Sequence, residues 1–318
     1  MGAGERVVTI IDHIQHEFGF SRNELVAYAG TCPHRYKTYN IRKRNGDPRT
    51  ISQPSKDLKA VQRFIVSRFF EDQFVIHEAA TAYRKGVSIV DNAKPHLNSS
   101  YLLKMDFKNF FPSIKSDDFV TYLVEMGIYE DEARILSRIF FKKERDELVL
   151  SIGAPSSPII SNALLHEFDE RVAQYSKERS LNFTRYSDDI TISTNVENVL
   201  FDVPNYINEL LGDIRLPRLR INEEKTVFSS KKFNRHVTGI TISNEGQASL
   251  GRSKKRRLKA AVHSADKLTE IERFKLRGRL AFAKQVDPKF IELLHAKYPK
   301  QISLINSAQW AWDLSDFL

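Results

Sequence analysis

The stretch RYSDDITIS, residues 185–193, places two adjacent carboxylates, Asp188 and Asp189, between short runs of strand-forming residues. These runs, 183–186 and 190–193, read as two strands joined by a tight turn. Like charges in a partly buried site repel each other unless a cation or hydrogen bonds compensate. A polar hairpin turn is the simplest interpretation of the pair taken alone, because Asp is a common turn residue. The rest of the chain decides between a turn and a functional pair.

The composition is that of an ordinary soluble globular protein, with 318 residues of which 41% are hydrophobic and 28% are charged. This length allows one large or two ordinary domains. Cys32 is the only cysteine, which excludes an intramolecular disulfide and a multi-cysteine zinc site. No signal peptide and no run of ~20 apolar residues is present, so we expect a cytoplasmic protein without a membrane partner.

The charge balance is basic and uneven along the chain. Lys and Arg number 49 against 40 for Asp and Glu, giving a formal net charge of +9. Such an excess suggests a polyanionic partner, most often nucleic acid. The run RSKKRRLK, residues 252–259, concentrates six cations in eight residues. A solvated helix face is the alternative, but the run opens a predicted helix rather than a loose tail, which favours nucleic-acid contact.

The hydrophobic periodicity predicts helices and strands that do not alternate regularly, which indicates an α+β fold. A strand is expected at 101–107, and hairpins are expected at 36–52 and 232–243. The helices are expected at 7–18, 57–70, 156–175 and from Arg252 onward, the last of them at 307–318.

A third carboxylate, Asp106, ends the predicted strand YLLKMD and precedes the aromatic run FKNFF. If this strand lies beside the hairpin, Asp106, Asp188 and Asp189 converge. Three carboxylates at one point require divalent cations, and hard oxygen ligands suit Mg²⁺. Two such ions about 4 Å apart activate an attacking hydroxyl and stabilise a leaving pyrophosphate. The pattern therefore predicts nucleotidyl transfer, with two Mg²⁺ ions as cofactors.

Four motifs resemble those of reverse transcriptases. YSDD at 186–189 resembles the Y-x-D-D signature of the family, and MDFKNFFPSI at 105–114 resembles its first palm motif. GAPSSP at 153–158 resembles the second palm motif, and INEEKT at 221–226 resembles the motif that carries a palm lysine. The order and spacing of the four motifs are specific, and the resemblance covers roughly residues 35–290.

Three further elements narrow the resemblance to retron reverse transcriptases. DNAKPH at 91–96 is similar to their N-A-x-x-H element, and VTG at 237–239 is similar to their V-T-G element. GRLAFAKQVDPKF at 278–290 resembles retron thumb sequence. We expect no maturase or endonuclease region of the kind that follows the thumb in group II intron enzymes.

The resemblance implies a right-hand polymerase of fingers, palm and thumb, with an antiparallel palm sheet and a basic, helical thumb. The expected divisions are an N-terminal helical extension, the fingers, a palm with a fingers-type insertion near 115–150, and the thumb. Their expected bounds are 1–30, 31–98, 99–240 and 241–318.

The resemblance also implies roles for the residues of the catalytic motifs. Asp106, Asp188 and Asp189 become the catalytic carboxylates and, with the backbone carbonyl of Phe107, the metal ligands. Lys225 becomes a candidate general acid for the leaving pyrophosphate. An ordinary helix start with a surface lysine is the alternative for Lys225.

Six positions are implied to bind the incoming deoxynucleoside triphosphate: Lys43, Arg49, Phe111, Gly153, Pro155 and Ser156. Arg49 would grip the triphosphate and Phe111 would exclude a 2′-hydroxyl, although an exposed cation and a core aromatic are the alternatives. Gly153 would allow the backbone to approach a base or sugar. Ile152 stands where many reverse transcriptases have Gln, so the sugar contact of that Gln is in doubt.

Nine positions are expected to contact RNA or DNA: Asn92, His96, Thr238, Gly239, Arg252, Lys254, Lys255, Arg256 and Arg257. Cations of the basic helix would contact phosphates. For Asn92 and His96 the alternative is a structural role that shapes the site. For VTG the alternative is a tight strand with a Gly bulge.

The implied function is RNA-directed DNA synthesis on a co-encoded structured non-coding RNA in the bacterial cytoplasm. A 2′-hydroxyl of that RNA would prime synthesis and yield branched multicopy single-stranded DNA (msDNA). The complex would act in antiphage defence with a separate effector protein. Two alternatives stay open. One is another defence-associated reverse transcriptase, protein-primed or template-free, and the other is an inert nucleic-acid-binding scaffold.

Overall fold

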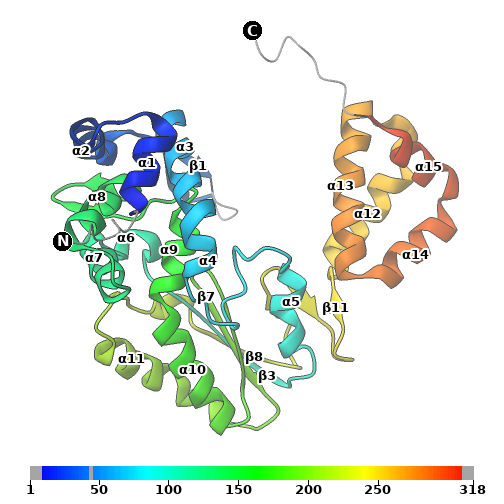
Figure 1. The fold of residues 1–318 in the computed structure, drawn as a ribbon. Coiled ribbons are helices and arrows are strands. Elements are labelled where there is room, and N and C mark those ends of the chain that lie inside the picture. Colours follow the sequence, from blue (N-terminus) through cyan, green and yellow to red (C-terminus); the bar gives the residue numbers. More distant parts are fainter. Residues whose placement is uncertain (1–8, 43–45, 310–318) are drawn as a thin grey trace.

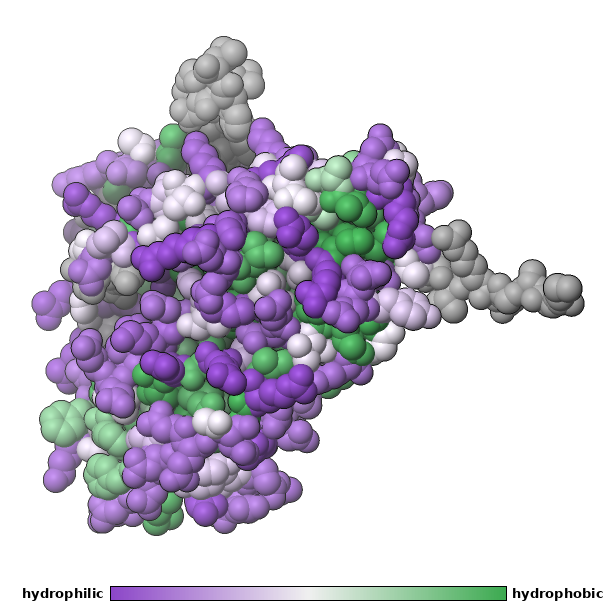
Figure 2. All heavy atoms as spheres, turned by 90° about the vertical axis from the view of Figure 1, so that its left-hand side faces the viewer, coloured by the Kyte–Doolittle hydropathy of each residue, from purple (hydrophilic) through white to green (hydrophobic). Residues whose placement is uncertain are grey.

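The computed structural model describes residues 9–42 and 46–309, shown as a ribbon in Figure 1. Predicted residue Lys43 and the predicted helical segment beyond residue 309 lie outside the described residues. Within the described ranges, no helix combines the length and apolar character needed to cross a membrane. The face on the N-terminal side is predominantly hydrophilic, with small hydrophobic areas (Figure 2).

A four-stranded sheet in the order β6-β7-β3-β8 lies at the centre of the chain. All of its strand pairs are antiparallel, as expected for a polymerase palm. The expected strands of 101–107, 183–186 and 190–193 are all present within it. The strands are β3 (Tyr101–Asp106), β6 (Asn182–Tyr186), β7 (Asp189–Thr194) and the edge strand β8 (Val227–Ser230).

Two helices, α9 (Ser157–Leu164) and α10 (His166–Glu178), run along the sheet (Figure 1). A single helix over 156–175 was expected, and this is wrong. The backbone of Leu165 (φ −92°, ψ 10°) leaves the α conformation and divides the segment. The apolar stripe still points one way, and Ile160, Phe168 and Val172 enter the main core.

The N-terminal part packs on the same hydrophobic core as the palm. The predicted hairpin is confirmed as β1 (Tyr36–Arg42) and β2 (Pro48–Pro54). Side chains of Thr9 and Ser21 cap the first two helices through capping boxes. The helices are α1 (Ile10–Phe18), α2 (Arg22–Thr31), α3 (Lys56–Ile65), which continues as a π-helical turn (Val66–Phe70), α4 (Glu71–Gln73) and α5 (Ile89–Ala93).

Between β3 and α9 the chain forms three helices and a small hairpin, over residues 110–149. Its elements are α6 (Phe110–Ser113), α7 (Ser116–Glu125), α8 (Glu130–Phe140), β4 (Lys142–Glu144) and β5 (Glu147–Val149). Phe119 and Phe140 pack edge-to-face at 5.9 Å in the core. Helix α11 (Val203–Asp213) follows β7.

The C-terminal part has a second hydrophobic cluster and stands to one side of the palm (Figure 1). Leu102 of β3 and Ala93 of α5 belong to this cluster, so it is anchored to the palm. The predicted hairpin over 232–243 is confirmed, and the chain is mainly helical from Arg252 to Ser307, as predicted. The predicted helix over 307–318 is not confirmed, because residues 308 and 309 are not helical and the rest of it lies outside the described residues. The elements are β9 (Arg235–Val237), β10 (Ile240–Ile242), β11 (Ala248–Ser249), α12 (Arg252–His263), α13 (Glu270–Val286), α14 (Pro288–Lys297) and α15 (Pro299–Ser307).

Candidate active site

The palm sheet brings the three predicted carboxylates together at one end. Asp106 on β3 lies opposite Asp189 on β7 in the antiparallel register. The backbone N–H of Phe107 donates a hydrogen bond to the carbonyl of Asp188 at 3.1 Å, which ties the turn to the end of β3. Ser187 adopts a left-handed conformation (φ 61°) and sets the direction of the turn. Asp188 and Asp189 therefore belong both to a hairpin turn and to a carboxylate cluster.

The cluster is electrostatically unfavourable without a cation. Burial raises the pKa of Asp189 to about 6, with Lys104 opposing the shift and Asp188 and Asp106 adding to it. Burial, followed by the charge of Asp106, raises the pKa of Asp188. A bound divalent cation would remove both penalties, because it stabilises the ionised carboxylates.

The carboxylates fit Mg²⁺ by their chemistry, although they do not already form a closed cage. In the described ranges, no group of three or more His, Cys, Asp or Glu is placed so that it could hold a metal ion as it stands. Mg²⁺ rarely uses an all-protein cage and instead keeps waters and takes substrate phosphates. Asp106, Asp188 and Asp189 are therefore the residues that would hold it.

Lys225 occupies the position where a cation would be expected. Its Nζ lies 2.7 Å from Oδ1 of Asp106, and its side chain is 57% exposed. It ends the 3₁₀ turn Glu223–Lys225, which directs the side chain toward β3. Backbone bonds hold this segment, since the N–H of Asn222 donates to the carbonyl of Asp106 at 2.7 Å.

Of the three aromatic rings after Asp106, only Phe111 keeps partial exposure. Phe107 and Phe110 are buried and stack with ring centroids 5.5 Å apart. Phe111 packs on Phe110 at 5.1 Å and lies at the margin of the core. The geometry therefore leaves Phe111 as the ring that could face a bound nucleotide.

The loop that contains Gly153 packs closely against strand β2 of the fingers hairpin. A Cβ on Gly153 (φ 115°) would lie 3.1 Å from Ile51 and 3.2 Å from Gln53. The N–H of Ser52 donates to the carbonyl of Ile152 at 2.8 Å. The positive φ and the close approach to β2 both require glycine at this position.

The other predicted nucleotide-binding residues differ in exposure. Pro155 is half-buried, while Ser156 is fully buried and its hydroxyl has no hydrogen-bond partner in the part of the chain described. Arg49 is exposed on β2, and its charge lowers the pKa of Asp188 against the larger raising effects of burial and Asp106. Arg49 therefore lies within electrostatic reach of the carboxylates.

Sequence reasoning missed Tyr83, whose hydroxyl donates to Oγ of Ser187 at 3.1 Å. Burial raises the pKa of Tyr83, with Asp188 contributing. Residues around it pair with the outer edge of β6, where Ala80 forms a parallel bridge with Arg185. This pairing is long-range, so no local pattern could have shown it.

Two of the three retron-like elements, at 91–96 and 237–239, meet inside the protein. Asn92 and His96 are fully buried, and Asn92 Nδ2 donates to Thr238 Oγ1 at 3.3 Å. His96 lies 2.7 Å from Ser193 Oγ and 2.8 Å from Thr184 Oγ1, and burial lowers its pKa to about 3. Burial favours the structural role for both residues over contact with RNA.

The V-T-G element forms the two-residue turn between β9 and β10. Thr238 (φ 44°) and Gly239 (φ 80°) both have positive φ, as a type I′ hairpin turn requires. The expected alternative of a Gly bulge is therefore wrong, because the residues connect the strands rather than interrupt one.

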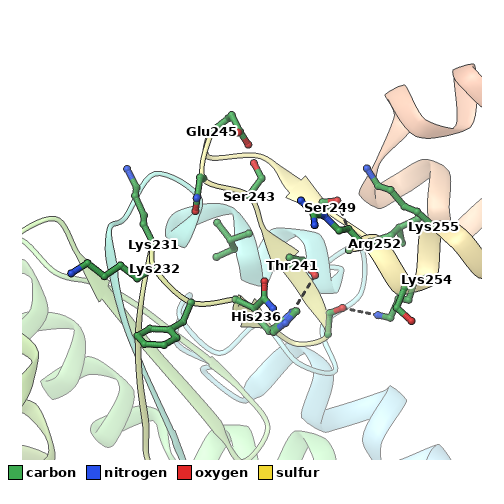
Figure 3. A pocket seen from close by; sticks show the side chains of 18 of the residues that line it. Lys231, Lys232, His236, Thr241, Ser243, Glu245, Ser249, Arg252, Lys254 and Lys255 are labelled. Atoms are coloured by element: carbon green, nitrogen blue, oxygen red, sulfur yellow. Dashed lines mark hydrogen bonds between the residues drawn. The ribbon is translucent and has the colours of Figure 1, made fainter.

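A large basic pocket of about 1290 Å³ lies between the palm edge and the thumb (Figure 3). It is lined by cations from both parts, including Lys104, Arg252, Lys254, Lys255 and Arg257. Lys104 stands two residues before Asp106, so the pocket adjoins the carboxylate cluster.

The cations of α12 are not equivalent. Lys254 Nζ donates to the carbonyl of Gly239 at 2.7 Å, and Lys255 pairs with Asp287 at 2.6 Å. Arg252 and Arg257 line the pocket, whereas Arg256 is exposed and does not. The predicted RNA or DNA contacts of α12 therefore divide into pocket-lining and outward-facing residues.

Comparison with known proteins agrees with the geometry. The family model described as reverse transcriptase (RNA-dependent DNA polymerase) matches residues 41–242. Retron Ec83 reverse transcriptase of Escherichia coli is 41% identical over 271 residues, which cover 83% of this chain and 86% of that protein. Retron Ec86 reverse transcriptase of Escherichia coli is 31% identical, and the match covers 85% of this chain and 84% of that protein.

Among solved structures, telomerase from Candida tropicalis with a fragment of telomeric RNA matches with a TM-score of 0.48 and 14% identity. The match covers 96% of this chain and 60% of that one. The family match spans more than half of the chain, and the identity to retron enzymes extends over most of it. The chain therefore belongs to the reverse transcriptases, which are RNA-directed DNA polymerases, and within them to the retron reverse transcriptases.

Proposed function

We propose that this polymerase copies a structured non-coding RNA encoded beside it, starting from a 2′-hydroxyl of that RNA, and produces branched msDNA. The observation that carries the proposal is the register of Asp106 against Asp189, with Lys225 at 2.7 Å from Asp106. The similarity to retron reverse transcriptases over most of the chain supports the RNA template and the primer.

In this proposal each active-site residue has a separate task. Asp106, Asp188 and Asp189, with the carbonyl of Phe107, would hold two Mg²⁺ ions. When bound, this metal pair would supply activation of the attacking hydroxyl and charge stabilisation for the leaving pyrophosphate. Lys225 moves from Asp106 to the pyrophosphate and protonates it.

Residues around the metal site select and hold the nucleotide. Arg49 binds the triphosphate through its planar guanidinium group. Phe111 excludes a nucleotide that carries a 2′-hydroxyl. The loop of Gly153, Pro155 and Ser156, which packs against β2, supports the nucleotide. Lys43 would join Arg49 in binding the triphosphate.

The basic pocket holds the template–primer next to the carboxylates. Its cations from β3 and α12 neutralise phosphates without reading sequence, so binding should weaken steeply with salt. We assign the bounds 1–30, 31–98, 99–240 and 241–318 to the extension, fingers, palm and thumb. Action in the bacterial cytoplasm, in antiphage defence with a separate effector, rests on the family resemblance alone.

The test is to express the protein with its native flanking DNA and analyse the nucleic acid that copurifies. We expect a short DNA covalently joined to RNA, resolved on a denaturing gel after RNase or DNase treatment. The Asp188→Asn, Asp189→Asn protein should bind the RNA but lack the DNA.

Two other results would contradict the proposal. RNA without DNA in both samples would favour the scaffold alternative. DNA without an RNA branch would favour another defence-associated polymerase.

A further inference from the structure

An exposed aromatic groove lies along the edge of the palm sheet, beside β8. The groove has a volume of about 580 Å³ and is lined by Phe201, Phe228 and Phe233, among others. These rings are 61%, 42% and 70% exposed. Phe201 and Phe228 lie 5.1 Å apart. Exposed rings gathered in one groove mark an interaction site rather than ordinary surface.

The groove is continuous with the basic pocket. Lys231, Lys232 and Phe233 line both. Figure 3 shows Lys231 and Lys232 on the opposite side of the basic pocket from Lys254 and Lys255. A nucleic-acid strand that lies in the basic pocket can therefore extend past Lys231 and Lys232 into the aromatic groove.

The charges at the groove favour an anionic ligand. Lys231 and Lys232 are exposed, and neither forms an ion pair within residues 9–42 and 46–309. Glu197 is the opposing charge in the lining, and it accepts a hydrogen bond from the hydroxyl of Tyr101. The two lysines thus outnumber the one carboxylate, and that carboxylate is already engaged.

We propose that this groove binds a single-stranded segment of nucleic acid that continues from the template–primer in the basic pocket. Unpaired bases would stack on Phe201, Phe228 and Phe233, and their phosphates would contact Lys231 and Lys232. Aromatic rings beside cations are the usual platform for single strands, because every base offers a flat face. A duplex cannot stack its paired bases in this way. The proposal rests on the proposed template–primer site.

The experiment compares a blunt RNA–DNA duplex with the same duplex carrying a tail of about ten nucleotides, a typical site size for such grooves. Separate tails of oligo(dT) and oligo(U) distinguish product DNA from RNA as the natural source. Binding is measured by fluorescence anisotropy on the full chain. We expect either tail or both to tighten binding by about tenfold, since stacking contributes on that order per base.

The Phe201→Ala, Phe228→Ala protein should lose this gain and still bind the blunt duplex, because these two residues line the groove and not the basic pocket. Tyr129→Ala is the matched control, because Tyr129 is a 72% exposed aromatic residue that does not line the groove. The Lys231→Gln, Lys232→Gln protein should also bind the tail more weakly, with a shallower salt dependence. Thermal melting confirms that each variant is folded.

An equal gain in the double Phe variant, or no gain in the wild type, would overturn the inference. If sedimentation instead showed that the groove mediates self-association and the Phe variant abolished it, a second copy of the chain would replace nucleic acid as the ligand. If the wild type failed to bind even the blunt duplex, the proposed template–primer site would be wrong. That result differs from normal duplex binding without a gain from the tail, which would contradict only the proposed groove.

Discussion

Arg185 Nη2 lies 2.6 Å from Asp169 Oδ2, and both side chains are completely buried next to the turn that carries Asp188. Arg185 Nε donates to the other carboxylate oxygen at 2.7 Å, and Nη1 donates to the carbonyl of Ser187 at 2.9 Å. Nη1 also donates to Asn162 Oδ1 at 3.2 Å. The ion pair therefore links α10 and α9 to the backbone of the turn that carries Asp188.

Replacing Arg185 by Met should destabilise the protein by about 3–5 kcal/mol, because the charge of Asp169 would stay buried without a partner. The free energy of unfolding is measured in urea. The double change Arg185→Met, Asp169→Leu should recover much of the stability, since no unpaired charge remains. It should not recover polymerase activity, because the Ser187 carbonyl no longer has its hydrogen-bond donor.

Arg134→Met is the matched control, since Arg134 forms an exposed helical pair with Glu130 at 2.6 Å. This change should cost less than about 1 kcal/mol. Equal losses of stability for the two arginines would contradict the role assigned to burial. Full activity of the folded double variant would contradict the role at the turn.

The convergence of the three carboxylates could be predicted from the sequence because each motif is local. Asp106 ends a strand, and Asp188 and Asp189 occupy a turn between strands, so their convergence required only that β3 and β7 be neighbours. Tyr83 and Asp169 escaped prediction, because their contacts with Ser187 and Arg185 depend on tertiary packing. The close contact between Gly153 and β2 is likewise set by how the fingers meet the palm.

The break between α9 and α10 and the burial of polar side chains were also not predictable from local sequence patterns. The break at Leu165 interrupts a stripe of apolar residues whose helical period continues on both sides, so the pattern alone predicts one helix. Burial of Asn92 and His96 depends on β6, β7 and the Thr238 turn, which lie far away in sequence. Alternation and periodicity identify elements but do not identify which polar side chains they enclose.

The contribution of Asp189 to the stability of the metal-free protein should fall as pH rises from about 4 to about 6. The pKa of Asp189 is raised in the folded state to about 6, from an ordinary value of 3.8. The folded state therefore holds this proton more tightly, and its contribution is present at low pH and lost as pH passes through the folded pKa. The difference between the folded and the ordinary pKa of Asp189 corresponds to a change of about 3 kcal/mol at most in the free energy of unfolding.

Asp189→Asn should remove this dependence and exceed the wild type in stability above pH 6, while losing activity. Urea unfolding in the presence of a chelator, at several pH values, measures the effect. Asp131→Asn, at an exposed position of α8, is the control and should follow the wild-type profile. Parallel profiles for wild type and Asp189→Asn would show that the carboxylate is not destabilising.

Lys225→Met should tighten Mg²⁺ binding several-fold and still reduce the rate of DNA synthesis. The ammonium group competes with metal for Asp106, but its side chain is 57% exposed, so the gain in affinity is modest. Loss of a general acid should lower kcat by about 10²-fold or more. Mg²⁺ affinity is obtained from the rise in Tm with metal concentration.

Lys108→Met provides the control, because Lys108 is exposed near the same strand end and forms no ion pair in the described part of the chain. It should change neither the Mg²⁺ affinity nor kcat by much. A normal kcat for the Lys225→Met protein would show that Lys225 is not the general acid. Weaker Mg²⁺ binding would show that Lys225 supports the metal site rather than competing with metal.

Arg257→Gln should weaken duplex binding more than Arg256→Gln, although the two residues are adjacent cations of one helix. Arg257 lines the basic pocket, and Arg256 points elsewhere. Removing one cation that binds a phosphate lowers the slope of log affinity against log salt by about 0.7–0.9. Affinity of a blunt RNA–DNA duplex is therefore measured over a range of salt concentrations for both variants.

Both variants carry the same net charge, so a long-range effect of charge would act on them equally. We expect a shallower salt slope for Arg257→Gln and a nearly unchanged slope for Arg256→Gln. Equal slopes would mean that the thumb attracts nucleic acid through its overall charge. A larger effect at Arg256 would place the duplex on the outer face of α12, and the basic pocket would then lose its assigned ligand.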